Sequence, residues 1–93
     1  MGVISQIDFK KRISEFFIID VRELDEDGLI NGAVRIPLGD LLTQLKFFNL
    51  PTNKEIVCYC RSGNRSQIAV DFLIKKGFRA LNLEGGIKSF QPL

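Results

Sequence analysis

The sequence predicts an α/β protein built around a central, mostly parallel sheet with helices on both faces. Residues 16–20 (FFIID) and 56–60 (IVCYC) are short apolar runs, typical of strands that are buried on both faces. Residues 38–48 and 65–76 instead place their apolar side chains three and four positions apart, as amphipathic helices do. Strands that alternate with helices favour parallel pairing through right-handed crossovers.

Length and composition limit the class of protein. The 93 residues fit one domain, which we expect to span residues 1–93. Hydrophobic residues make up 45% and charged residues 26%, the balance of an ordinary globular protein. The net charge is only +2, and no basic run indicates a nucleic-acid surface. No stretch approaches the roughly 18 apolar residues of a membrane span, so we expect neither nucleic acid nor membrane as a partner.

The cysteine pattern favours a reducing compartment. The two cysteines, Cys58 and Cys60, are one residue apart, whereas a disulfide framework needs widely spaced pairs that close long loops. The first six residues lack the long apolar core of a signal peptide. A cytoplasmic location is therefore the expectation.

The first third of the chain is expected to hold one short helix and two strands. Ser5 can cap a helix that has Asp8 at its third position. The strand over 16–20 leads into 21–32, where four acidic residues and two glycines are typical of a loop. The next strand, over 33–36, is very short because a proline follows it.

The remaining chain continues the alternation. The expected elements are a helix over 38–48, a turn over 51–53, a strand over 56–60, a helix over 65–76, a strand over 80–83 and a last helical turn ending at 90. Gly77 ends the second of these helices, and two consecutive glycines, Gly85 and Gly86, end the last strand. Reactive residues of parallel sheets gather at the carboxyl ends of strands, where Cys60 stands.

The segment CYCRSGNRS, from Cys58 to Ser66, is the candidate site. A strand, a polar loop and a helix start direct free backbone N–H groups toward one concave spot. Helix N-termini and nearby cations favour thiolate over thiol, so Arg61 and Arg65 can help to ionise Cys60. The chain has no histidine, and this arrangement needs none.

The other residues of this segment have simpler interpretations. Cys58 lies inside the strand, so we interpret it as an inert core residue. Gly63 allows a sharp turn or a close approach of the backbone. Three polar residues are equally consistent with helix capping and with substrate contact: Ser62, Asn64 and Ser66.

Three runs, in this order, resemble the signatures of single-domain rhodaneses, a family of sulfurtransferase modules. They are FFIIDVRE, GLINGAVRIPLGDL and IVCYCRSGNRSQIAVDFLIKKGFRALNLEGGI, and the resemblance covers about residues 15 to 90. It implies a three-layer fold with a parallel sheet of about five strands. It also implies that Cys60 carries a persulfide sulfur from a small anionic donor such as thiosulfate to cyanide, a thiol or a cysteine of a partner protein. Neither a metal nor an organic cofactor is expected, because Cys-x-Cys alone offers too few ligands for zinc.

The resemblance assigns roles residue by residue. Cys60 is the implied sulfur carrier, and the rest of a six-residue substrate-binding loop is Arg61, Ser62, Gly63, Asn64 and Arg65. Asp20 and Arg22 match the family's Asp and Arg at the end of an early strand, and we expect them to form an ion pair that supports the site. Two departures are visible, Leu29 where the family usually has His and Phe90 where it often has Trp.

Three alternatives remain open at this point. A cysteine-dependent phosphatase or arsenate reductase also combines a thiolate with N–H donors, but the phosphatase pattern has five residues between Cys and Arg, and Arg65 follows Cys60 after four. A non-catalytic docking module usually loses the cysteine. A sulfur relay within a biosynthetic pathway differs in its partner rather than in its chemistry. The sequence leaves the oligomeric state open.

Overall fold

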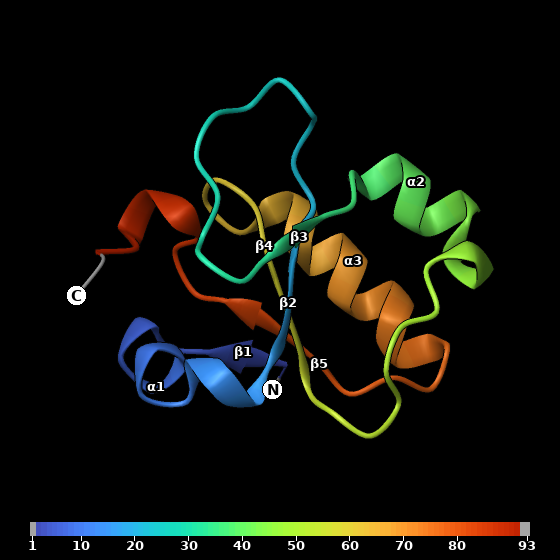
Figure 1. The fold of residues 1–93 in the computed structure, drawn as a ribbon, viewed down its shortest axis with the longest axis horizontal. Helices are drawn as coiled ribbons and strands as arrows, with labels where there is room; N and C mark the ends of the chain where they lie inside the picture. The colour runs from blue at the N-terminus through green and yellow to red at the C-terminus, as the bar shows by residue number, and fades with distance from the viewer. Residues whose placement is uncertain (1, 92–93) are drawn as a thin grey trace.

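A computed structural model describes residues 2–91 and contains a five-stranded, fully parallel sheet with the strand order β1-β5-β4-β2-β3. The strands are β1 Val3–Ile4, β2 Phe17–Asp20, β3 Val34–Arg35, β4 Ile56–Tyr59 and β5 Ala80–Leu83. Figure 1 shows β2 and β4 side by side with their carboxyl ends at the top. The predicted α/β architecture is confirmed.

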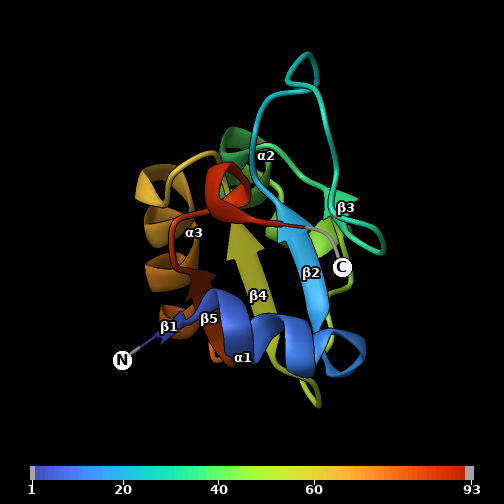
Figure 2. The same ribbon diagram turned by 90° about the vertical axis from the view of Figure 1, so that its left-hand side faces the viewer.

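Helices cover both faces of this sheet. The α-helices are α1 Gln6–Lys11, α2 Leu38–Thr43 and α3 Asn64–Lys75, and the 3₁₀ helices are η1 Ile13–Glu15, η2 Leu45–Phe47 and η3 Ile87–Ser89. Figure 2 shows α1 and η3 on one face, and α2 and α3 on the other. No helix within residues 2–91 has the length and apolar character that a membrane crossing requires.

The core consists of two clusters, one on each face of the sheet. Alternate residues of β4 enter different clusters: Ile56 and Cys58 pack toward α2 and α3, whereas Val57 and Tyr59 pack toward the opposite face with Phe9 of α1. This alternation is the period of two that extended strands impose. Cys60 continues the first set, so its side chain belongs to the face that α3 covers.

Several element boundaries differ from the sequence-based prediction. Strand β1 was not predicted, because two residues carry no periodicity; it forms where Glu84 N–H donates to the Ile4 carbonyl at 2.9 Å. The helix predicted over 38–48 is interrupted at Gln44, whose ψ of 30° leaves the helical range before η2 begins. The helix predicted from residue 65 begins one residue earlier, at Asn64.

Candidate active site

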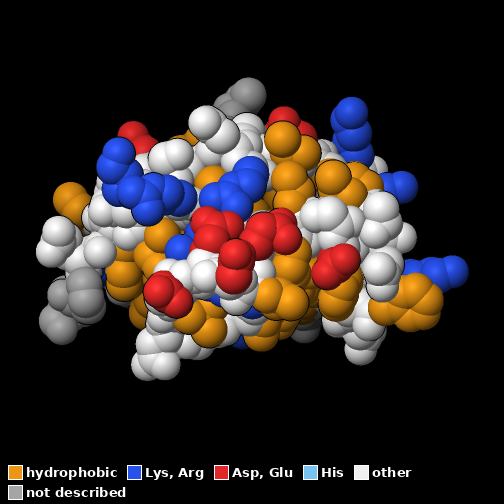
Figure 3. Space-filling model, turned by 90° about the horizontal axis from the view of Figure 1, so that it is seen from above, with side chains coloured by type: hydrophobic (Ala, Val, Ile, Leu, Met, Phe, Trp, Pro, Cys, Tyr) orange, Lys and Arg blue, Asp and Glu red, His pale blue; other side chains and the backbone are white. Residues whose placement is uncertain are grey.

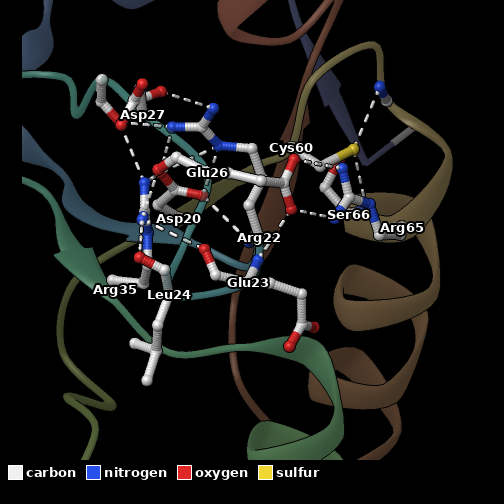
Figure 4. Close-up of polar contacts among 12 residues, drawn as sticks. Asp20, Arg22, Glu23, Leu24, Glu26, Asp27, Arg35, Cys60, Arg65 and Ser66 are labelled. Atoms are coloured by element: carbon white, nitrogen blue, oxygen red, sulfur yellow. Dashed lines mark hydrogen bonds and ion pairs between the residues drawn. The ribbon is translucent and has the colours of Figure 1, made fainter.

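Cys60 lies directly after β4 with only 2% of its surface exposed. Its Sγ accepts hydrogen bonds from the backbone N–H groups of Gly63, at 3.2 Å, and Ser66, at 3.4 Å. The Ser66 hydroxyl lies 3.3 Å from the same sulfur. Gly63 is the N-cap of α3 with φ of 120°, a left-handed conformation that favours glycine and turns the chain sharply around the sulfur. Figure 4 shows the sulfur directed toward the start of α3.

These donors make Cys60 a better acid than an ordinary thiol. Burial of the thiol opposes ionisation, but the Ser66 hydroxyl and the backbone N–H groups of Ser66, Gly63 and Ser62 outweigh it and lower the pKa of Cys60. Within residues 2–91 no hydrogen bond to the Cys58 thiol is found, and complete burial raises the pKa of Cys58 to about 12. The main stabilisation of the Cys60 thiolate therefore comes from the helix start and the loop N–H groups.

Asn82, in the middle of β5, holds the loop from behind. Its Oδ1 accepts a hydrogen bond from the Ser66 hydroxyl at 2.5 Å, and its Nδ2 donates to the Gly63 carbonyl and the Gln67 Oε1, both at 3.1 Å. Asn82 is buried. Asn82 was not predicted as part of the site, although an asparagine within the apolar run ALNL is a signal for a buried hydrogen-bond partner. Of the two roles left open for Ser62, Asn64 and Ser66, capping of α3 is not observed, because Gly63 occupies the N-cap and no side chain bonds there.

The segment after β5 holds the outer side of the same loop. Ile87 N–H donates to the Cys60 carbonyl at 2.9 Å, and Lys88 N–H donates to the Arg61 carbonyl at 3.0 Å. Gly86 has φ of 61°, and a Cβ there would lie deep inside the van der Waals radii of the carbonyl oxygens of Arg61 and Cys60. The two glycines were predicted only to end a strand; Gly86 also lets two loops approach closely.

A buried carboxylate lies beneath the loop over 21–32. Asp20 is completely buried, and its Oδ2 lies 2.8 Å from Nη2 of both Arg22 and Arg35. Burial alone would raise the pKa of Asp20, but the two guanidinium groups outweigh it and hold that pKa below its ordinary value. The structure thus contains the expected ion pair of Asp20 with Arg22, and adds Arg35, which was not predicted from the sequence.

The same two arginines fix the path of the loop by binding its carbonyl groups. Arg35 Nη1 donates to the carbonyls of Glu23, at 3.1 Å, and Glu26, at 2.7 Å. Both arginines donate to the carbonyl of Gly28, at 2.9 Å in the case of Arg35. These hydrogen bonds restrict the conformation of the loop, because each guanidinium group offers several donors in a fixed plane and the loop carbonyls accept from them.

Glu26 links this loop to the loop that contains Cys60. Its carboxylate forms a bidentate ion pair with Arg65, with distances of 2.6 Å to Nη1 and 3.0 Å to Nη2 (Figure 4). Within residues 2–91, the exposed Arg61 has no carboxylate within ion-pair distance. Of the two arginines predicted to favour the thiolate, one is thus matched by a carboxylate and the other faces solvent. Acidic and basic side chains lie next to each other on this end of the molecule (Figure 3).

The two departures from the family pattern line a separate cavity of about 500 Å³ on the α1 face. Leu29 is 51% exposed, and the Phe90 ring packs edge-on against Phe9 with centroids 6.0 Å apart. Neither residue contacts the Cys60 sulfur by hydrogen bonding: Leu29 is part of the loop over 21–32, and Phe90 follows η3, which holds the loop of Cys60.

The comparisons with known proteins agree on one family. The model of the rhodanese-like domain matches residues 5–92. "Putative sulfurtransferase YtwF" of Bacillus subtilis is 39% identical over 79 residues, which are 83% of this chain and 75% of the relative. "Sulfurtransferase" of Allochromatium vinosum is 36% identical over 76 residues, covering 78% of this chain and 69% of the relative.

Among solved structures, a rhodanese-related protein from Thermoplasma volcanium aligns with a TM-score of 0.88 at 34% identity, over 96% of this chain and 89% of that one. The relatives' names indicate a role of the sulfurtransferase type, in agreement with a loop that directs N–H donors at a thiol. The fold, the family match and these relatives together lead to one conclusion: the chain belongs to the rhodanese-like domain family.

Proposed function

We propose that this protein is a sulfurtransferase that carries a persulfide sulfur on Cys60, from a small anionic donor such as thiosulfate to a nucleophilic acceptor. The observation that supports it most is the position of the Cys60 sulfur within hydrogen-bond reach of two backbone N–H groups and one hydroxyl. Such preorganised donors stabilise negative charge on a thiolate and equally on a persulfide. The sulfurtransferase names of the relatives support the same reaction class.

In the loading step, the Cys60 thiolate attacks the outer sulfur of thiosulfate. A sulfur–sulfur bond forms to Cys60, the bond between the two sulfur atoms of thiosulfate breaks, and sulfite leaves with the electron pair. Arg61 is exposed beside Cys60, so its charge is available to attract the donor anion. Asn64 and Ser62 are also exposed beside Cys60, and we include them in the surface that would bind thiosulfate.

In the unloading step, the acceptor attacks the outer sulfur of the persulfide. The bond to Cys60 breaks and the thiolate leaves with the electron pair, so its lowered pKa favours departure. Cyanide is the simplest acceptor, and its product is thiocyanate. A small thiol or a cysteine of a partner protein is an acceptor of the same chemical class.

Thiocyanate formation from thiosulfate and cyanide tests the proposal. Intact mass spectrometry after thiosulfate treatment should reveal one additional sulfur atom that cyanide removes. Cys60→Ser should neither gain that sulfur nor turn over, whereas Cys58→Ala, which removes a completely buried thiol whose pKa is raised to about 12, should retain most activity. Turnover by Cys60→Ser would refute the mechanism.

Loop size distinguishes sulfur transfer from phosphate chemistry. The N–H groups of Gly63 and Ser66 lie 3.2 and 3.4 Å from the Cys60 sulfur, and we expect the loop from Cys60 to Arg65 to fit closely around one sulfur atom, whereas a tetrahedral phosphate against the thiolate needs a wider cradle. Misplacement of reacting atoms by about 1 Å can cost on the order of a hundredfold in rate. Inserting one Gly between Gly63 and Asn64 should therefore lower sulfur transfer sharply, and the natural loop should hydrolyse phosphate esters poorly. Faster ester hydrolysis than thiocyanate formation would favour the phosphatase alternative.

A further inference from the structure

We propose that Glu26 is a positioning residue that sets the charge balance at Cys60 by holding the guanidinium group of Arg65. The proposal rests on the proposed function, because it concerns the ionisation of the same thiol. Its structural basis is an ion pair that joins two loops across 39 positions of the chain, directly beside the residues that contact the sulfur.

The Glu26 carboxylate is held in place on its own loop. Besides its two contacts with Arg65, its Oε2 accepts a hydrogen bond from the backbone N–H of Glu23 at 2.9 Å. The backbone carbonyl of Glu26 accepts from Arg35 Nη1 at 2.7 Å, and Arg35 is in turn paired with the buried Asp20. A surface ion pair normally loses much of its effect to the freedom of its side chains, and these anchors reduce that freedom.

The other end of the ion pair lies beside the sulfur. Arg65 is the second residue of α3 and directly precedes Ser66. The N–H and the hydroxyl of Ser66 both contact the Cys60 sulfur. The pKa of Arg65 is raised, first by Glu26 and to a smaller extent by the charge of Cys60, so the carboxylate and the thiolate act on the same cation. The side chains of Arg65 and Glu26 are 36% and 29% exposed, so solvent screens the pair only in part.

The neighbouring charges do not provide this balance. Asp20 is matched by Arg22 and Arg35 in the interior. Glu23 and Arg22 lie near the pair and act on it through space, but neither forms an ion pair with Glu26 or Arg65 in residues 2–91. Glu26 is thus the carboxylate that compensates the Arg65 charge, and the Ser66 hydroxyl and the backbone N–H groups remain the main stabilisers of the thiolate.

This balance affects reactivity as well as ionisation. A thiolate becomes less nucleophilic as its pKa falls, with a Brønsted coefficient of about 0.4–0.5. An uncompensated Arg65 would lower the pKa of Cys60 further and make the fully ionised thiolate slower toward an electrophile. Compensation by Glu26 therefore preserves the nucleophilicity of a thiolate whose formation the Ser66 hydroxyl and the N–H groups favour.

The test measures the pH dependence of Cys60 alkylation by iodoacetamide, in a Cys58→Ala background so that one thiol reports. Glu26→Gln removes the charge but retains an amide oxygen that accepts from Arg65. We expect its alkylation midpoint to fall by at least about half a pH unit, which corresponds to roughly threefold more thiolate below the midpoint. Asp25→Asn is the matched control, because it removes the same charge from the adjacent, exposed residue, whose carboxylate forms no ion pair or hydrogen bond within residues 2–91. Its midpoint should move by less than about 0.2 units.

The double variant Glu26→Gln with Arg65→Gln decides whether the effect passes through Arg65. It removes one negative and one positive charge, so its midpoint should return to within about 0.2 units of the parent. An unchanged midpoint in Glu26→Gln, an equal shift in Asp25→Asn, or a shift that persists in the double variant would each overturn the proposal. Alkylation of Cys60 does not require sulfur transfer, so these outcomes test the role of Glu26 alone. The proposed function has its own refuting result, which is thiocyanate formation by Cys60→Ser. Circular dichroism of each variant verifies the fold. If Glu26→Gln does not fold, Glu26→Asp replaces it: its shorter side chain moves the carboxylate away from Arg65, and its alkylation midpoint must also fall.

Discussion

Ser66→Ala separates the two contacts that this residue makes with the Cys60 sulfur. The substitution removes the hydroxyl, 3.3 Å from Sγ, and retains the backbone N–H, 3.4 Å from Sγ. Ser66 is completely buried within α3, and alanine is the best helix former, so the helix itself should remain intact. The change therefore reports on one hydrogen bond.

The expected magnitude follows from the number of protons available. A hydrogen bond to a charged acceptor contributes about 1.5–3 kcal/mol. The Ser66 hydroxyl has one proton, however, and its oxygen also lies 2.5 Å from Asn82 Oδ1. Donation to the thiolate gives up a neutral hydrogen bond of about 1 kcal/mol, so the net gain is about 1 kcal/mol, or somewhat less than one pKa unit.

We therefore expect the pKa of Cys60 to rise by about 0.5–1 unit in Ser66→Ala. Below the Cys60 midpoint, where the hydroxyl donates to Asn82, loss of that donor should also lower the free energy of unfolding by about 1–3 kcal/mol. Alkylation rate against pH, in the Cys58→Ala background, measures the first quantity, and urea denaturation measures the second. Ser62→Ala is the matched control, because its hydroxyl is exposed on the same loop. A midpoint that does not move in Ser66→Ala, or moves equally in Ser62→Ala, would refute the assigned hydrogen bond.

Three further predictions concern the supports of the loop. Gly86→Ala should lower thiocyanate formation on the order of a hundredfold, because the new Cβ forces the carbonyls of Cys60 and Arg61 away from η3. Gly39→Ala is the control and should retain activity, since a Cβ there meets nothing within 4 Å. Arg35→Gln should lower the free energy of unfolding by on the order of 3 kcal/mol in urea denaturation, because it leaves the buried Asp20 with one cation, whereas the exposed Arg79→Gln should change it little. The free energy of unfolding should fall as pH decreases from about 4.5 to about 2, because the folded-state pKa of Glu26 is lowered to about 2 and that of Asp20 is also lowered. Each carboxylate stabilises the fold at pH values above its unfolded-state pKa and loses that contribution when it is protonated. Urea midpoints across this range should show a smaller loss in Glu26→Gln, and an equal loss would contradict the role of the ion pair.

Local features of the fold and of the loop were predictable from the sequence. The apolar run over 56–60 is too short for a helix, and the period of 3.6 that follows makes a helix of the next segment. A cysteine at that junction meets the free N–H groups of the helix start, because backbone geometry alone directs them. The Ser5 cap shows the same local logic, since its hydroxyl accepts from Asp8 N–H at 3.1 Å as the spacing predicted.

The partners of the loop could not be predicted in this way. Glu26 lies 39 positions from Arg65, Asn82 lies 16 positions from Ser66, and Arg35 lies 15 positions from Asp20. An acidic loop, an asparagine and an arginine have no periodicity that assigns them to one another. Each pairing depends on which distant segments the fold brings together, and local conformational preferences carry no information about that.

The sequence by itself determined which residues could be strands or helices and which thiol stands at a helix start, because these properties depend on neighbours a few positions away. The tertiary structure decided what surrounds that thiol. The order β5-β4-β2-β3 brings the carboxyl ends of β2 and β4 to one edge and lays Asn82 of β5 beneath the loop. Which carboxylate meets which guanidinium is then a consequence of strand order and of the need to pair buried polar groups, and both are properties of the assembled sheet.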